Sequence, residues 1–445
     1  MSKSQNAPER QKSGRRPLLL VAAAVLVVGI VGAVVVFNQN DEPTTGKEPI
    51  VIGMQAELSG GFSSWGYWLH KAAVAAVKKV NEEGGIDGRP VKLVVEDTET
   101  NPATGVRKLK KLILKDNADF IIGAVHSGVM LASMPVAKEH KRIYVPVGMA
   151  SEGTGEGSNR YVFRLSTHVR EQIAASADWV VNNPEGPNVK KWTTVMTDYQ
   201  WGWSHEEWFS KTAKESGGEI LAQIRIPQGT KDFVPYISKI PKDTEALYFI
   251  FFGADSLGFI QQLHDSGYSG KKFTMVCTME AIDVAKLGAA AEGTWLLEFL
   301  PREIKQDGLD SALLATFDTE YHQGFREAVG IDNDGNEVGN PNRVSACSHC
   351  WATYEIVHLF KKAVEESGWK GQEDNDKMIR AMEGIQLKAS HNFPQGDAYV
   401  RKEDHQGFHR HWMSRIVNGR IQVQFEIPMK DTDYPPPIDL SNTGK

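Results

Sequence analysis

Short apolar runs alternate with amphipathic segments along most of the chain. Residues 50–54 predict a strand, and residues 67–85 predict a helix because Leu69, Ala73 and Val80 fall on one helical face. The same alternation continues through 91–97, 103–116, 120–125, 130–140 and 143–147. Almost continuously apolar strands that alternate with helices are typical of a parallel sheet covered on both faces.

The alternation then starts again, which predicts a second α/β unit of similar size. Its apolar runs lie at 191–198, 245–253, 272–277 and 294–299. An extended stretch at 160–166 suits the crossing from the first unit to the second, and residues 295–303 suit the return.

The C-terminal part completes both units. The helix expected at 350–367 packs on the first unit after the return. Residues 409–427 predict a strand–turn–strand hairpin with Asn418 and Gly419 at the turn. The expected organisation is a first lobe of 49–163 with 299–388, a second lobe of 164–298 with 389–430, and a polar, Pro-rich tail at 431–445 without a packed core of its own.

The N-terminal segment differs from the rest of the chain. A basic stretch at 1–17 precedes an uncharged apolar run at 18–37, and a polar linker at 38–48 follows. The run has about the length of a membrane-spanning helix, and it lacks the cysteine of a lipoprotein anchor. We favour an uncleaved membrane anchor over a cleaved signal peptide. In both cases the basic residues stay in the cytoplasm, so the folded part lies outside it, in the periplasm.

Composition narrows the class of partner. The chain has 445 residues and a formal net charge of −6, and no basic stripe with interleaved aromatics follows the first residues. These features argue against a nucleic-acid partner. Of the three cysteines, Cys347 and Cys350 are close enough for a local disulfide in an oxidising compartment, and Cys277 is expected to be a buried apolar residue.

Catalytic and metal-binding motifs are missing from the sequence. It contains no G-x-S-x-G elbow, no H-E-x-x-H helix and no P-loop, so we expect neither an enzyme nor a cofactor. Residues 332–336, DNDGN, are read as a surface turn rather than a calcium loop. His405, His409 and His411 are expected on a solvated strand face, without a metal.

The aromatic stretch TDYQWGWSHEEW at 197–208 is read as a loop. Trp201 and Trp203 flank Gly202, and an exposed loop gains little from two indoles unless something covers them. Trp203 and Trp208 are assigned to packing, because helical spacing from the loop turns at least one of them inward.

Several stretches together resemble the periplasmic substrate-binding proteins of branched-chain and hydrophobic amino-acid ABC importers. They are IGMQAELSGGFSSWG, NEEGGIDGRPVKLVVEDTETNP, FIIGAVHSG, IYVPVGMAS, TDYQWGWS, DFVPYISKI and RKEDHQ, in the family's order over roughly residues 48–430. The resemblance implies a type I periplasmic-binding-protein fold, with two Rossmann-like lobes joined by three crossover segments. It further implies a ligand between lobes that close on it, and docking of the closed form onto a membrane permease.

The resemblance also implies which tryptophans face the ligand. Family members place an aromatic residue before a glycine after the first strand of each lobe, and Trp65 and Trp201 occupy these positions. Closure would sandwich a ligand between their indoles. The alternative is that both pack as lid residues against their own helices.

Ser127 matches a family serine that directly follows a strand. Its hydroxyl and the nearby backbone N–H groups at a helix start would hold a carboxylate, since a helix N-terminus favours an anion. The alternative is a plain helix cap. His126 would lend a donor, or a positive charge at mildly acidic pH.

Recognition of an ammonium group is less regular. Val147 and Gly148 keep the carbonyls that amino-acid binders offer, but Met149 replaces the usual hydroxyl residue. Asp255 and Glu280, which follow strands of the second unit, would supply acidic partners for a cation, or else cap the helices behind them.

The sequence therefore predicts the extracytoplasmic solute-binding component of an ABC importer. Its ligand is expected to be a small amino-acid-like, amide or carboxylate compound, and its partners are a permease and its ATPase subunits. The alternative function is a membrane-anchored sensor domain that reports ligand binding to a separate signalling protein.

Overall fold

The computed structural model describes residues 47–183, 186–268, 273–277, 281–306 and 308–441. The predicted N-terminal helix at 18–37 lies outside these residues. Within the described part of the chain, no helix combines the length and the apolar character needed to cross a bilayer. The side chains of Cys277 and Cys347 also lie outside the description, so the disulfide between Cys347 and Cys350 stays a prediction.

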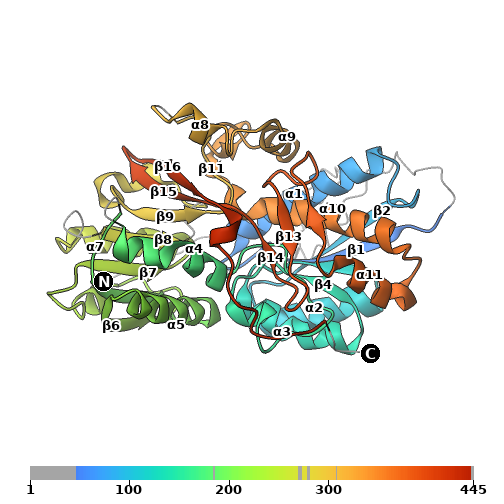
Figure 1. Ribbon diagram of the computed structural model, residues 1–445, viewed down its shortest axis with the longest axis horizontal. Coiled ribbons are helices and arrows are strands. Elements are labelled where there is room, and N and C mark those ends of the chain that lie inside the picture. Colours follow the sequence, from blue (N-terminus) through green and yellow to red (C-terminus); the bar gives the residue numbers. More distant parts are fainter. Residues whose placement is uncertain (1–46, 184–185, 269–272, 278–280, 307, 442–445) are drawn as a thin grey trace, which may run out of the picture. The chain divides into compact units, whose positions relative to one another are not determined.

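The first sheet of the described chain has four parallel strands in the order β2-β1-β3-β4 (Figure 1). These are β1 (Ile50–Ala56), β2 (Val91–Asp97), β3 (Phe120–Ile122) and β4 (Ile143–Val145). Alternate residues of β3 enter different cores: Ile121 packs with α2 (Pro102–Leu114) and α3 (Ser127–Glu139), whereas Phe120 and Ile122 pack with α1 (Ser63–Glu82) and α10 (Cys347–Ser367). The sheet is thus covered on both faces, as the apolar pattern predicted.

The second sheet has seven described strands in the order β16-β15-β9-β8-β7-β5-β6. The parallel strands are β5 (Lys191–Thr197), β6 (Glu219–Ile226), β7 (Ala246–Ile250), β8 (Phe273–Cys277) and β9 (Trp295–Glu298). In Figure 1 the hairpin of β15 (His411–Val417) and β16 (Arg420–Ile427), in red, lies antiparallel beside β9. Asn418 and Gly419 form its turn with φ values of 51° and 72°, which confirms the predicted hairpin.

Helices and short strands complete the described chain. The helices are α4 (Val169–Asn182), α5 (Gln200–Glu215), α6 (Val234–Ile237), α7 (Gly253–Asp265), α8 (Ser311–Leu314), α9 (Glu320–Val329) and α11 (Asn375–Met382). The short strands are β10 (Asn336–Glu337), β11 (Asn340–Val344), β12 (Gln386–Leu387), β13 (Ala398–Val400) and β14 (Gly407–Phe408). The helix α10 packs on α1, as expected for the return to the first unit.

Two local features of the second unit differ from the predictions. The strand β6 was not predicted, because its exposed Glu219, Gln223 and Arg225 interrupt the apolar run that marks the other strands. Residues 200–208 are helix rather than loop, since α5 already begins at Gln200. Trp203 consequently points outward and is 39% exposed, whereas Trp208 is partly buried against the core.

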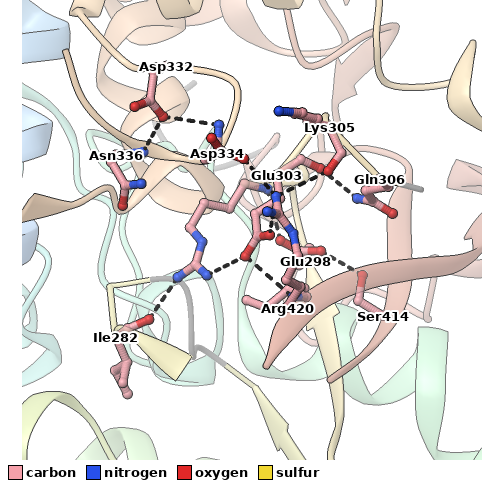
Figure 2. Close-up of polar contacts among 12 residues, drawn as sticks. Ile282, Glu298, Glu303, Lys305, Gln306, Asp332, Asp334, Asn336, Ser414 and Arg420 are labelled. Atoms are coloured by element: carbon pink, nitrogen blue, oxygen red, sulfur yellow. Dashed lines mark hydrogen bonds and ion pairs between the residues drawn. The ribbon is translucent and has the colours of Figure 1, made fainter. Parts of the chain in front are cut away.

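A polar network, buried at Arg302 and Glu303 and exposed at Asp334, joins three segments that are distant in sequence (Figure 2). Glu303 accepts hydrogen bonds from Arg302 at 2.6 Å and from the backbone N–H of Ile421 on β16 at 3.3 Å. Arg420 bridges Glu303 and Asp334 at 3.0 and 2.8 Å. The network attaches the predicted turn at 332–336 to the hairpin.

The histidines near the C-terminus are not on a solvated face. His405, His409 and His411 are all fully buried, so that expectation was wrong. No group of three or more His, Cys, Asp or Glu in the described chain is arranged to hold a metal ion.

The described part of the tail packs against the body of the protein. The guanidinium groups of Arg170 and Arg401 lie over the ring of Tyr434 at 4.2 and 4.7 Å, and the hydroxyl of Tyr434 contacts His168 Nε2. The described tail residues therefore contact Arg170, Arg401 and His168 of the body of the protein.

Candidate functional site

A cavity lies where residues that follow strands of both sheets come together. It has about 300 Å³ of space not occupied by protein atoms, open solvent included, of which about 20 Å³ can take the centre of a water molecule. Its walls are mainly aromatic and apolar: Phe62, Trp65, Val125, Ser127, Met149, Tyr199, Trp201, Phe252 and His349. All of these except His349 follow the carboxyl ends of parallel strands, where open α/β sheets bind ligands.

Trp65 and Trp201 reach the cavity through the same local geometry. Each lies in the first turn of a helix, directly before a glycine. A Cβ atom on Gly66 would come within 2.0 Å of the Glu57 carbonyl oxygen, and one on Gly202 within 2.0 Å of the Thr197 carbonyl oxygen. Glycine lets each helix begin against the end of the preceding strand, so the Trp-Gly pair fixes the indole at the cavity wall.

Aromatic rings from the two sets of elements touch each other at the cavity. Phe62 directly precedes α1, and Phe252 directly precedes α7; their ring centroids are 4.2 Å apart. Tyr199 precedes α5, and its ring centroid lies 6.4 Å from that of Phe62 and 6.0 Å from that of Phe252. Trp65 and Trp201 each lie within 6.5 Å of Phe252 by ring centroids.

Polar contacts near the cavity also join the loop after β4 to α5. Ser204 donates a hydrogen bond to Glu152 at 2.9 Å, and the indole N–H of Trp208 donates to Ser151 Oγ at 3.2 Å. Residues around the first sheet therefore contact residues around the second through both rings and hydrogen bonds.

The indole N–H of Trp201 is an unpaired donor at the cavity wall. The Nε1 atom is buried and has no hydrogen-bond partner in the described part of the chain. The ring is held edge-on against His205, with centroids 5.3 Å apart. Because an unpaired buried donor is costly, a ligand with an acceptor at this point would gain free energy by pairing with it.

His126 and Ser127 lie at the start of α3, but their roles differ from those expected. His126 Nδ1 accepts a hydrogen bond from Val129 N at 3.3 Å, so His126 and not Ser127 caps the helix. Ser127 Oγ lines the cavity and accepts a hydrogen bond from Ala150 N at 3.2 Å. Burial lowers the pKa of His126 to about 4, which disfavours the positive charge considered for mildly acidic pH. Its ring stacks instead on Tyr199, with centroids 5.1 Å apart.

Of the three loop residues after β4, only Met149 lines the cavity. Its Sδ atom lies 3.2 Å from Nε2 of His349 and 3.3 Å from Nε2 of Gln172. Val147 is buried beside it in the core, and Gly148 is not part of the cavity wall. Binding of an ammonium group by the carbonyls of Val147 and Gly148 stays a prediction.

Of the two predicted acidic partners, only Asp255 lies within the described residues. Asp255, in the first turn of α7, accepts a hydrogen bond from Gly229 N at 2.7 Å. It thereby fixes the turn after β6 and is not among the residues that line the cavity, so its contact with a cationic ligand stays a prediction. Glu280 lies outside the described residues, and its role stays a prediction.

Sequence reasoning missed a buried carboxylate beside the cavity. Glu57 follows β1 and accepts hydrogen bonds from the backbone N–H groups of Val125 and His126, at 3.1 Å each. Burial raises the pKa of Glu57 to about 7, against the opposing effect of these two hydrogen bonds. Of the missed wall residues, Phe62, Tyr199 and Phe252 share one signal, because each stands between a strand and the helix after it.

This architecture agrees with the match of the sequence to a known protein family. The sequence profile described as periplasmic binding protein matches residues 49–420. The chain belongs to the periplasmic binding protein family. The Leu/Ile/Val-binding protein homolog 3 of Brucella melitensis biotype 1 is 28% identical over 220 residues, which are 49% of this chain and 58% of that relative. The chain thus matches little more than half the length of that relative.

Two other relatives match a larger share of the chain. The Leu/Ile/Val-binding protein homolog 6 of Brucella suis biovar 1 is 22% identical over 343 residues, 76% of this chain and 80% of the relative. The crystal structure of a solute-binding protein of an ABC transporter from Rhodopseudomonas palustris BisB5, in complex with 3,4-dihydroxybenzoic acid, superposes with a TM-score of 0.71. It is 20% identical, covers 86% of this chain and 98% of its own, and so shares the fold. These relatives are binding proteins and not enzymes.

Proposed function

We propose that this periplasmic binding protein is the solute-binding component of an ABC importer and catalyses no reaction. The observation that carries the proposal is the aromatic cavity of about 300 Å³, whose walls follow strands of two separate parallel sheets. Only about 20 Å³ of this space can take the centre of a water molecule, room for roughly one water, so a solute would enter as the lobes open. The relatives named as Leu/Ile/Val-binding proteins and the solute-binding protein with 3,4-dihydroxybenzoic acid support the same class.

Capture would occur by closure of two lobes, residues 49–163 with 299–388 and residues 164–298 with 389–430. The ring contact of Phe62 with Phe252 and the hydrogen bond of Ser204 to Glu152 cross between these lobes. Such contacts suit a closed form and would break on opening. Membership of β15 and β16 in the second sheet and the packing of α10 on α1 fit this division, but the pairing of β12 with β13 crosses the boundary between 388 and 389.

The ligand would be a compact amino-acid-like, amide or carboxylate compound with a flat apolar part. Trp65 and Trp201 would cover its faces, because indoles supply large rigid contact areas. Ser127 and the unpaired N–H of Trp201 would supply polar anchors. None of the wall residues is Lys, Arg, Asp or Glu, so a charged group on the ligand would find no oppositely charged side chain in the wall.

The proposed location and partners rest on the family and on the N-terminal sequence. The family name fits a periplasmic position, and we propose that residues 18–37 anchor the protein in the inner membrane, or direct its export and are then removed. The closed, loaded form would dock on a permease that works with ATPase subunits.

A ligand screen tests this function. Amino acids, amides and aromatic acids are added to the purified protein, stabilisation is measured by thermal shift, and the bound mass is read by native mass spectrometry. We expect a solute of unchanged mass to bind, and Trp65→Ala combined with Trp201→Ala to abolish its binding, whereas Trp203→Ala on the same helix keeps it. A chemically altered solute, or equal binding by the double variant, would contradict the proposal.

A further inference from the structure

Glu57 fills the position that a ligand carboxylate would be expected to occupy. The backbone N–H groups of Val125 and His126, here called the amide pair, lie between β3 and the start of α3. One carboxylate oxygen of Glu57 accepts from Val125 N and the other from His126 N, both at 3.1 Å. Both oxygens are therefore engaged, as they would be in a bound carboxylate ligand.

The amide pair lies directly beside the wall of the cavity. Val125 and Ser127, on either side of His126, both line the cavity. The side chain of Glu57 is only 1% exposed and reaches the pair from the neighbouring strand β1. The pair directly precedes the start of α3 at Ser127, where a helix favours an anion, and Glu57 already places a carboxylate from within the chain beside that start.

The charge of Glu57 also reaches the opposite wall. Burial, and then the negative charge of Glu57, hold the pKa of Tyr199 well above its ordinary value. Tyr199 comes from the second sheet and lines the cavity. A second carboxylate between these walls would be close to Glu57 and would have neither the amide pair nor a cationic wall residue to bind.

We propose that Glu57 is a specificity-determining residue, which occupies the amide pair in place of a ligand carboxylate and makes the cavity select uncharged amides over carboxylates of the same shape. This inference rests on the proposed function, and it chooses among the ligand classes given there. The chain would thus differ in ligand charge from its structural relative that holds 3,4-dihydroxybenzoic acid.

The first test compares benzamide with benzoate, which have the same ring and differ in charge. Dissociation constants are measured by calorimetry at pH 8, where Glu57 is mostly ionised. We expect the wild type to bind benzamide at least 10-fold more tightly than benzoate. Glu57→Ala frees the amide pair and should shift this ratio at least 10-fold toward benzoate. Glu298→Ala removes another buried carboxylate away from the cavity and should leave the ratio unchanged.

The second test probes the amide pair without relying on either ring compound. Sodium acetate, compared with sodium chloride at the same ionic strength, should raise the melting temperature of Glu57→Ala in a saturable way. It should not raise that of the wild type or of Glu57→Gln, whose side chains fill the position.

The outcomes separate the two proposals. A wild type that prefers benzoate, an unchanged ratio in Glu57→Ala, or the absence of acetate stabilisation in that variant would each overturn the role of Glu57. If the wild type binds no solute in the screen while acetate stabilises Glu57→Ala, the proposed function fails and the occupation of the amide pair by Glu57 stands.

Discussion

Replacing Trp201 by phenylalanine separates ligand recognition from the stability of the free protein. Phenylalanine keeps an aromatic ring at the cavity wall but removes the buried Nε1–H, which has no partner in the described chain. The variant thus deletes one hydrogen-bond donor and part of one ring, and nothing else.

The magnitude follows from the two opposing changes. The smaller ring loses roughly 1–2 kcal/mol of apolar burial. Removal of an unpaired buried donor raises the free energy of unfolding by roughly 1–3 kcal/mol. The free energy of unfolding of the free protein should therefore change by only about 1 kcal/mol. A bound ligand that accepts from this N–H relieves the same cost, so its loss should weaken binding roughly 5- to 100-fold.

The assay is calorimetric titration of the solute found in the screen, combined with the melting temperature of the free protein. Trp203→Phe is the matched control, because its indole N–H donates to Asp198 at 2.8 Å outside the cavity and its side chain is 39% exposed. We expect the control to bind like the wild type. Unchanged affinity in Trp201→Phe, or equal losses in both variants, would refute the role of the Trp201 donor.

Three further predictions concern the cavity and the fold. Trp65→Ala should lower solute affinity at least 10-fold in the same titration, because it removes one face of the aromatic site. Gly202→Ala should destabilise the protein by about 3 kcal/mol in denaturant unfolding, because the new Cβ would lie 2.0 Å from the Thr197 carbonyl oxygen. Burial raises the pKa of Glu298 from 4.5 to about 7, so its contribution to stability is complete below pH 4.5 and is lost as the pH rises through 7. The wild type should accordingly lose about 3 kcal/mol relative to Glu298→Gln between pH 4.5 and 8, measured by urea unfolding.

Each of these predictions has a distinct contrary result. Full affinity in Trp65→Ala would show that the first tryptophan does not contact the solute. An unchanged unfolding midpoint in Gly202→Ala would mean that α5 does not press on the end of β5. Parallel stability curves for the wild type and Glu298→Gln would mean that Glu298 has the same pKa in the folded and unfolded states.

The sequence predicted the architecture because the strands carry the signal themselves. Near-continuous apolar runs such as β1 and β7 are buried on both faces, and Asn418-Gly419 marks the hairpin turn. The strand β6 was not predicted, because charged residues interrupt its apolar positions. The start of α5 was read as a loop because Gly202 usually disfavours a helix, whereas here it permits close contact with β5.

The candidate site was predictable only where position after a strand was the signal. The resemblance to family members, which place ligand-binding residues after strands, indicated Trp65, Ser127, Met149 and Trp201, all of which line the cavity. It does not reveal what a side chain bonds to. Asp255 accepts a hydrogen bond from Gly229 N, and Glu57 accepts from the backbone N–H groups of Val125 and His126. These bonds join segments distant in sequence, so the sequence pattern does not predict them. His349 reaches the cavity on α10 and carried no local signal.

A crystal structure of the protein with the solute identified in the screen tests the central claim most directly. We predict the solute in the cavity between Trp65 and Trp201, with an acceptor atom within hydrogen-bonding distance of Trp201 Nε1. A solute bound elsewhere, with both indoles packed only against protein, would contradict the account.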